Sequence, residues 1–348
     1  MELVGTDEIR FKHCGRAGIV TLTRPKALNA LTHGMVKELA GALAQWASDG
    51  SVSVVVIKAE GRAFCAGGDI MDVYRARQED REAHDFFADE YRMNAQLAAF
   101  PKPYVSLIDG IVMGGGVGIS VHGSHRVMTE NGQLAMPEVG IGFFPDVGGS
   151  YVLSRLRDGF GMYLALTGGR IRTGDALWSG LATHYVPSAD LGGLSDVLCE
   201  TGDVEQAMAR FSPSRPPESD EAKLKAIASH FSRETLGDIL DSLADAAGRG
   251  DAFAKETLET ILTRSPTSLK VTFAQIREGR SLSMIECMEM EYRILRRMLT
   301  GHDFYEGIRA AIVEKGSKPM WDPVRLEDVS DEMVSAYFAP LQDGGLGL

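Results

Sequence analysis

Residues 110–120 read GIVMGGGVGIS, a short run of strand-forming residues followed by clustered glycine. Glycine allows two backbones to approach closely and allows a positive φ angle. Where such a cluster opens a helix, unpaired N–H groups lie at the positive end of the helix dipole and form a site for an anion or an oxyanion. Similar clusters occur at residues 61–70 (GRAFCAGGDI) and 139–150 (VGIGFFPDVGGS). Because each follows a strand-like run, we interpret the three clusters as functional rather than as turns alone.

Strands and helices alternate on both sides of this stretch. Short β-branched or apolar runs, typical of buried strands, occupy residues 18–23, 51–58, 104–108 and 126–128. Between the first two runs, apolar residues recur at helical spacing from Thr32, the predicted N-cap, to Ala47. This β-α-β order predicts an α/β core with parallel strands.

The character of the sequence changes at residues 212–219, SPSRPPES, where three prolines in eight residues indicate a boundary. Helical spacing of apolar residues then predicts helices at residues 221–247, 251–263, 267–279 and 283–300. Asp303 is a possible N-cap for a further helix at residues 304–315. We therefore expect a helical C-terminal region.

Charge and composition exclude several classes of protein. The 348 residues include 36 Lys and Arg against 48 Asp and Glu, a net charge of −12, so general nucleic-acid binding is not expected. The strongest apolar run, residues 52–57, is far too short for a membrane helix. Four scattered cysteines form no CxxC pattern, and Glu2, Asp7 and Glu8 argue against a secretory signal or a transit peptide. These observations favour a soluble cytoplasmic protein.

Familiar motifs for nucleotide and acyl-transfer chemistry are missing from the sequence. A dinucleotide-binding GxGxxG in the second cluster would need glycine at position 119 or 121, where Ile119 and Val121 stand. The chain contains no Gly-Lys dipeptide of a P-loop and no GxSxG nucleophile elbow. His122 and His125 form an HxxH, but no suitable third ligand follows, so we expect no metal site.

Two acids stand out within apolar surroundings. Glu138 lies in MPEV and Asp146 in FFPDVGG, and such carboxylates serve as base, acid or nucleophile. The alternatives are a surface turn for Glu138 and a helix N-cap for Asp146. Glu90, on a helical stretch at residues 85–100, has the alternative of a solvated surface charge.

Three motifs in a fixed order carry a family resemblance. RPKALNAL (residues 24–31), FCAGGDI (64–70) and MGGGVG (113–118) together resemble the crotonase, or enoyl-CoA hydratase/isomerase, superfamily. Segments that resemble its 3-hydroxyisobutyryl-CoA hydrolase branch are residues 114–127, 135–151, 265–272 and 301–310. The resemblance implies an α/β fold, with a crotonase-like (ClpP/crotonase) β/α spiral core at residues 1–205 that binds acyl-CoA. The helical region at residues 206–348 would then cover the site or mediate assembly.

The resemblance also implies roles for individual residues. The amides of Gly68 and Gly115 would form an oxyanion hole for the thioester carbonyl. Hydratases of the family use two glutamates, the second at Glu138 and the first at the position that is Gly118 here. The hydrolase branch likewise has glycine there, and it has the aspartate that is Asp146. The two amides and the two acids would then have to face one spot.

In this interpretation Glu138 acts as nucleophile, through an anhydride, or as general base for water. Asp146 would orient the substrate hydroxyl or the water and help to protonate the thiolate. Glu90 falls where the branch places a substrate-contacting glutamate. The other residues expected to bind substrate are Lys26, Ala27, Leu28, Ala66, Gly67, Asp69, Ile70 and Gly114.

The resemblance therefore predicts hydrolysis of 3-hydroxyisobutyryl-CoA, or of a related short 3-hydroxyacyl-CoA, in valine catabolism. An enoyl-CoA hydratase or isomerase and a non-catalytic CoA-binding protein are the alternatives. No metal or redox cofactor is expected, since CoA is part of the substrate. The expected partner is the acyl-CoA, with no nucleic acid and no membrane, and a homotrimer or homohexamer is possible.

Overall fold

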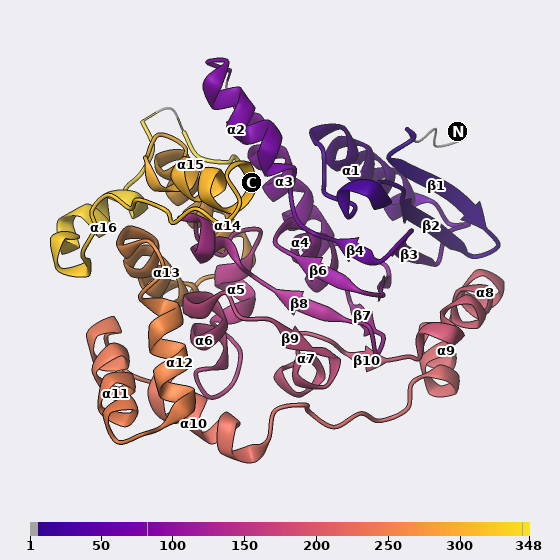
Figure 1. Ribbon diagram of the computed structural model, residues 1–348. Helices are drawn as coiled ribbons and strands as arrows, with labels where there is room; N and C mark the ends of the chain where they lie inside the picture. Colours follow the sequence, from indigo (N-terminus) through magenta and orange to yellow (C-terminus); the bar gives the residue numbers. More distant parts are fainter. Residues whose placement is uncertain (1–5, 82, 343) are drawn as a thin grey trace. The chain divides into compact units, whose positions relative to one another are not determined.

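In the computed structural model, residues 6–81, 83–342 and 344–348 are described, so Glu2 lies outside the described part (Figure 1). The chain divides into two compact units. The first comprises Met1–Asp69, Phe86–Ala135 and Ile171–Glu218, and the second comprises Ile70–Asp85, Met136–Arg170 and Ser219–Leu348. This partition differs from the single boundary expected after residue 205, which stays a prediction.

The first unit is built on a six-stranded sheet of order β1-β2-β3-β5-β7-β10. Its strands are β1 (Ile9–Cys14), β2 (Ala17–Leu22), β3 (Val54–Ala59), β5 (Tyr104–Ile108), β7 (His125–Met128) and β10 (His184–Tyr185). β1 and β2 form an antiparallel hairpin, and every later pairing in this sheet is parallel. The parallel α/β core expected from the β-branched runs is therefore confirmed.

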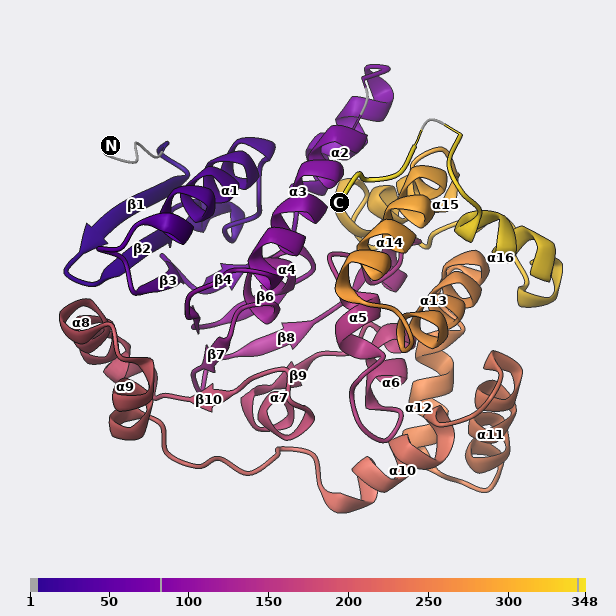
Figure 2. The ribbon, with the colours of Figure 1, turned by 180° about the vertical axis from the view of Figure 1, so that it is seen from behind.

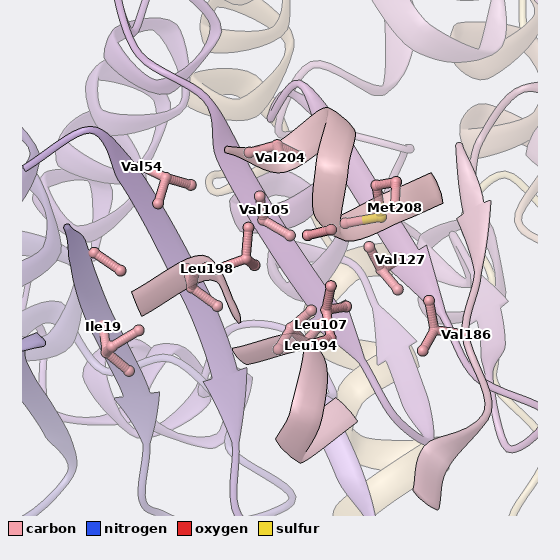
Figure 3. Packing of buried hydrophobic residues seen from close by; sticks show 13 residues of the cluster. Ile19, Val54, Val105, Leu107, Val127, Val186, Leu194, Leu198, Val204 and Met208 are labelled. Atoms are coloured by element: carbon pink, nitrogen blue, oxygen red, sulfur yellow. The ribbon is translucent and has the colours of Figure 1, made fainter. Parts of the chain in front are cut away.

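One face of this sheet is covered by α8 (Leu191–Thr201) and α9 (Val204–Phe211). Figure 3 shows Leu194 and Leu198 of α8, with Met208 of α9, over the valines of β3, β5 and β7. These side chains are almost fully buried, and each Leu or Val side chain contributes roughly 1.5–3 kcal/mol to folding through its burial. The buried apolar side chains of α8 and α9 thus hold these helices against the sheet.

The first unit also contains a smaller sheet, of order β4-β6-β8-β9. Its strands are β4 (Ala63–Cys65), β6 (Ile111–Met113), β8 (Gln133–Ala135) and β9 (Ile171–Arg172). Directly after β6 the chain enters the short helix α4 (Gly115–Val121), so the glycine cluster is a strand-to-helix turn. The unit's other helices are η1 (Pro25–Ala27), α1 (His33–Ser48), α3 (His84–Ala98, from Phe86), α7 (Thr173–Ser179) and η3 (Ser188–Asp190).

The second unit is helical (Figure 2). Its N-terminal elements are α2 (Ile70–Gln78), η2 (Glu138–Ile141), α5 (Gly149–Leu153) and α6 (Phe160–Thr167). Its C-terminal elements are α10 (Glu221–Phe231), α11 (Leu236–Gly248), α12 (Ala252–Ile261), α13 (Pro266–Gly279), α14 (Met284–Met298), α15 (Asp303–Ile308), the π-helical turn Arg309–Val313, η5 (Leu326–Asp328) and α16 (Asp331–Phe338). α13 packs against both α5 and α6.

Two expected helical elements were wrong in detail. The single helix expected at residues 221–247 is two helices, because Thr235 and Asp238 form a capping box that starts α11. Asp303 is the first residue of α15 rather than its N-cap, which is His302. By contrast, Thr32 caps α1 as expected, since its hydroxyl accepts a hydrogen bond from the Met35 amide.

The helices of the described segments are all too short or too polar to cross a lipid bilayer.

Candidate active site

In the first unit, two of the motif segments pair with each other through their backbones. The Ala66 amide donates to the Leu28 carbonyl at 3.0 Å, and the Leu31 amide donates to the Gly67 carbonyl at 2.8 Å. The Asp69 amide then donates to the Leu31 carbonyl at 2.9 Å. These bonds hold residues 28–31 and 66–69 side by side like two paired strands. We call this pair of segments the ledge; it includes predicted substrate-binding residues from both motifs.

The backbone amides of Gly68 and Gly115 lie close together. A Cβ atom placed on Gly115 would stand 3.3 Å from the Gly68 nitrogen. Gly115 is the first residue of α4, whose opening amides have no partner in the helix. Among the described residues, neither amide donates a hydrogen bond. Two free, adjacent N–H groups are the geometry that an oxyanion hole requires.

Neighbouring glycines make this approach possible. Gly67 has a φ of +110° and Gly114 a φ of +48°, values that residues with a side chain rarely adopt. A Cβ on Gly116 would stand 2.3 Å from the Cys65 carbonyl oxygen. The glycine cluster is therefore needed for the close contact between β4 and α4.

Glu90 on α3 is only 2% exposed, so its alternative as a solvated surface charge is excluded. Its Oε1 would lie 2.4 Å from a Cβ on Gly115, which places the carboxyl group beside the two free amides. Asn94, one helical turn later, is fully buried, and neither of its amide atoms has a hydrogen-bond partner among the described residues. Sequence reasoning missed Asn94, although the spacing of four from Glu90 was a usable signal.

The basic residues near this ledge differ in their surroundings. Lys26 and Ala27 are exposed at the end of η1, where Lys26 is accessible to a phosphate. Arg24 forms ion pairs with Glu8 at 2.9 Å and with Asp69 at 3.1 Å. Its guanidinium group is therefore already paired with carboxylates of the protein.

In the second unit, Glu138 and Asp146 are 7% and 5% exposed, so Glu138 is not in a surface turn. Glu138 begins η2, and its carbonyl accepts a hydrogen bond from the Phe143 amide at 3.1 Å. Asp146 is not a helix N-cap, because α5 begins at Gly149 after Gly148 as its N-cap. The predicted Ile70 is the first residue of α2 in this unit.

The segment that carries Asp146 is bound by side chains of the C-terminal helices. Glu291 of α14 accepts hydrogen bonds from the amides of Gly148 at 2.7 Å and Ser150 at 2.9 Å. Burial raises the pKa of Glu291 to about 8, and the negative charge of Asp146 adds to the rise, although the hydrogen bonds to Ser150 and Gly148 oppose it. Sequence reasoning missed Glu291, which no local motif distinguishes.

The structure thus brings Gly68, Gly115 and Glu90 together in the first unit, and it holds Glu138 and Asp146 on one buried segment in the second. That both groups act on one thioester stays a prediction. Gly118, where the resemblance places the first hydratase glutamate, is buried in α4 without a carboxylate. In the described segments, no group of three or more His, Cys, Asp or Glu is arranged to hold a metal ion.

A family model described as enoyl-CoA hydratase/isomerase matches residues 17–338. The chain belongs to the enoyl-CoA hydratase/isomerase family. The crotonase resemblance and the predicted fold class are therefore confirmed, and an acyl-CoA substrate fits this family.

Curated relatives confirm the branch of the family. The chain is 44% identical over 346 residues to a protein of Xenopus laevis named "3-hydroxyisobutyryl-CoA hydrolase, mitochondrial", covering 96% of this chain and 89% of the relative. A human protein of the same name is 41% identical over 352 residues, covering 98% and 90%. The expected cytoplasmic location was wrong by this comparison, because the names of these relatives point to mitochondria instead.

Solved structures of the family share the fold closely. A carnitinyl-CoA dehydratase from Mycobacterium thermoresistibile superposes with a TM-score of 0.91 at 41% identity, covering 97% of this chain and 98% of that one. An enoyl-CoA hydratase from Rhodobacter sphaeroides superposes with a TM-score of 0.90, also at 41% identity, covering 98% and 100%.

Proposed function

We propose that this protein hydrolyses the thioester of 3-hydroxyisobutyryl-CoA, or of a related short 3-hydroxyacyl-CoA, to the free acid and CoA. The observation that carries the proposal is the likeness to curated hydrolases along nearly the whole chain. Gly118 adds support, because a two-glutamate addition of water lacks its first carboxylate. The reaction belongs, in this proposal, to valine catabolism.

In the proposed mechanism, the amides of Gly68 and Gly115 stabilise negative charge on the thioester oxygen. As general base, Glu138 takes a proton from water while the water oxygen adds to the carbonyl carbon; the C–S bond then breaks and the CoA thiolate is protonated. As nucleophile, Glu138 displaces the thiolate to form an anhydride that water cleaves. Asp146 orients the water or the 3-hydroxyl and helps to deliver the proton. Lys26 and the ledge that includes Leu28 and Ala66 bind the CoA portion.

Neither route needs a metal ion or a redox cofactor, because positioned water, a carboxylate and an oxyanion hole suffice for thioester hydrolysis. A homotrimer or homohexamer is part of the proposal, and light scattering during gel filtration measures it.

The decisive measurement is release of free CoA thiol from 3-hydroxyisobutyryl-CoA, followed with a thiol dye. We expect wild-type protein to release thiol, and we expect Glu138→Gln and Asp146→Asn each to lower kcat about 100-fold or more. A panel of other 3-hydroxyacyl-CoA esters ranks the acyl specificity. Undiminished thiol release by both variants would show that these acids are not the catalytic groups.

The second candidate function is hydration or isomerisation of an enoyl-CoA. The names of the two solved structures, a dehydratase and a hydratase, favour it. Crotonyl-CoA distinguishes the candidates, because hydration removes its ultraviolet absorbance without releasing thiol. Conversion of crotonyl-CoA by a protein that leaves 3-hydroxyisobutyryl-CoA intact would replace the proposed function with this one.

Isotope labelling of the water tests the nucleophilic role of Glu138, because only an anhydride intermediate can carry the water oxygen into its side chain. In a single turnover in H₂¹⁸O, a general base places ¹⁸O in the product acid. A nucleophile whose anhydride is cleaved at the Glu138 carbonyl places the label in the protein, where mass spectrometry of the peptide detects it.

A further inference from the structure

The backbone directly after Asp146 is strained. Val147 is β-branched and only 1% exposed, yet its φ angle is +50°. This region of φ is unfavourable for a β-branched residue, and such a conformation persists only where the surroundings enforce it. Gly148 follows with a φ of +84°, so two consecutive residues turn the chain before α5 begins. Something outside the segment must therefore hold this turn.

The groups that hold it come from the C-terminal helices. The Ser268 hydroxyl of α13 donates to the Phe143 carbonyl at 2.6 Å. The Gln275 side-chain amide, also on α13, donates to the Pro145 carbonyl at 2.5 Å. Both bonds fix the chain on the N-terminal side of Asp146.

Glu291 holds the other side. One carboxyl oxygen accepts from the Gly148 amide, and the other accepts from both the amide and the hydroxyl of Ser150. These are the amides that follow the strained Val147, so the carboxyl group fixes the turn at the point where it is least favourable.

Glu291 is a residue whose burial lowers the stability of the folded protein. It is fully buried, and no basic side chain among the described residues forms an ion pair with it. Burial of an ionisable group without a counter-charge is costly, and burial raises the pKa of Glu291 to about 8. Such a group is retained more readily where it serves a site than where it only fills a core.

We propose that Glu291 is a positioning residue for the hydrolysis, which holds the turn after Asp146 so that the Asp146 carboxyl group keeps its catalytic orientation. The proposal rests on the proposed function of Asp146. Ser268 and Gln275 contribute by holding the backbone on the N-terminal side of Asp146. The C-terminal region then has a role besides covering the site or mediating assembly: it sets the shape of the catalytic segment.

A double-mutant cycle tests this coupling through kcat and KM for 3-hydroxyisobutyryl-CoA. Glu291→Gln keeps the size of the side chain but cannot accept at both ends, so one loop amide loses its acceptor. We expect kcat to fall about 10- to 100-fold, with KM changed less than about twofold. Combined with Asp146→Asn, it should lower kcat less than about twofold further, because both changes act through one group. A full multiplication of the two effects would overturn the proposal.

The matched control is Glu289→Gln on the same helix. Glu289 also accepts backbone amides, from Leu346 at 2.9 Å and Gly347 at 2.9 Å, but these belong to the C-terminal tail. We expect kcat of this variant to equal that of the wild type within about twofold. An equal loss of kcat in both variants would assign the effect to general disturbance of α14 and would also overturn the proposal.

Hydrogen exchange tests, without reference to activity, whether Glu291 holds the turn after Asp146. Mass spectrometry of a peptide that covers residues 147–153 should show faster amide exchange in Glu291→Gln than in the wild type and in Glu289→Gln. An unchanged rate of amide exchange in Glu291→Gln would refute the proposal that Glu291 holds this turn. If wild-type protein releases no thiol, the proposed function fails, and this measurement still decides whether Glu291 holds the turn.

Discussion

At the scale of single residues, position 115 has no room for a side chain. A Cβ there would stand 2.4 Å from the Glu90 carboxyl oxygen and 3.3 Å from the Gly68 nitrogen. We expect Gly115→Ala to lower kcat/KM for thiol release about 100-fold or more, because displacement of one oxyanion donor costs on the order of 3 kcal/mol.

The control for this variant is Gly41→Ala. Gly41 is exposed in α1 with no atom near a new Cβ, so alanine should raise stability by up to about 1 kcal/mol and leave kcat/KM unchanged. Wild-type activity in Gly115→Ala would contradict the assignment of an oxyanion hole to this amide.

The buried acid at position 291 predicts a pH-dependent stability. Its pKa is raised from an ordinary 4.5 to about 8 in the folded protein, so between these pH values the unfolded chain has lost a proton that the folded chain keeps. The contribution of this group to the free energy of unfolding therefore falls as pH rises from about 5 to 8. Glutamine cannot ionise, so Glu291→Gln lacks this fall.

Calorimetry at several pH values checks this prediction. The Tm of wild type relative to Glu291→Gln should decrease steadily from pH 5 to pH 8, and the same scan of Glu289→Gln controls for removal of a carboxylate from α14. Parallel Tm curves for wild type and Glu291→Gln would contradict the raised pKa.

Residue types predicted some positions of the candidate site and could not predict others. Glu138 and Asp146 were visible because each stands in an apolar segment beside a glycine cluster. Glu291 was not, because its partner Ser150 lies 141 positions away and nothing in ECMEMEY (residues 286–292) marks one glutamate among several. Such a contact arises only from packing of the folded chain.

At the scale of elements, α8 contributes to the first unit through its apolar face. Leu198 is fully buried beneath it in the core shown in Figure 3. We expect Leu198→Ala to lower the free energy of unfolding by about 2–5 kcal/mol, through lost burial and a residual cavity. Denaturant titration measures the change. Leu262→Ala is the control, since Leu262 is 64% exposed and should change stability by less than about 0.5 kcal/mol. A similar small change in both variants would contradict the packing of α8.

Element prediction succeeded where the pattern was long and regular. α1, β5 and α13 lie at the expected residues, since apolar periodicity and capping residues agree there. β9 and β10 have only two residues each, and their existence depends on neighbouring strands that supply hydrogen bonds. The break between α10 and α11 was missed because apolar residues continue at helical spacing on both sides of the capping box.

At the scale of the whole molecule, the second unit depends on chain segments that are distant in sequence. Residues 136–170 pack against α10, α12, α13, α14 and α15, and side chains of α13 and α14 form hydrogen bonds with their backbone. We expect a chain that ends at Glu218 to lose thiol release completely and to bind a hydrophobic dye, because buried Phe143, Phe144 and Phe160 lose their cover. Retained kcat in this shortened chain would contradict the dependence.

The contact between Glu291 and Ser150 also has a consequence for biosynthesis. The ribosome makes Asp146 long before it makes the helix that shapes the turn beside it, and domains otherwise form as their residues emerge. While residues 151–291 are being translated, the nascent chain therefore contains Asp146 without the glutamate that holds the turn beside it. We expect the chain to become active only after α14 has left the exit tunnel.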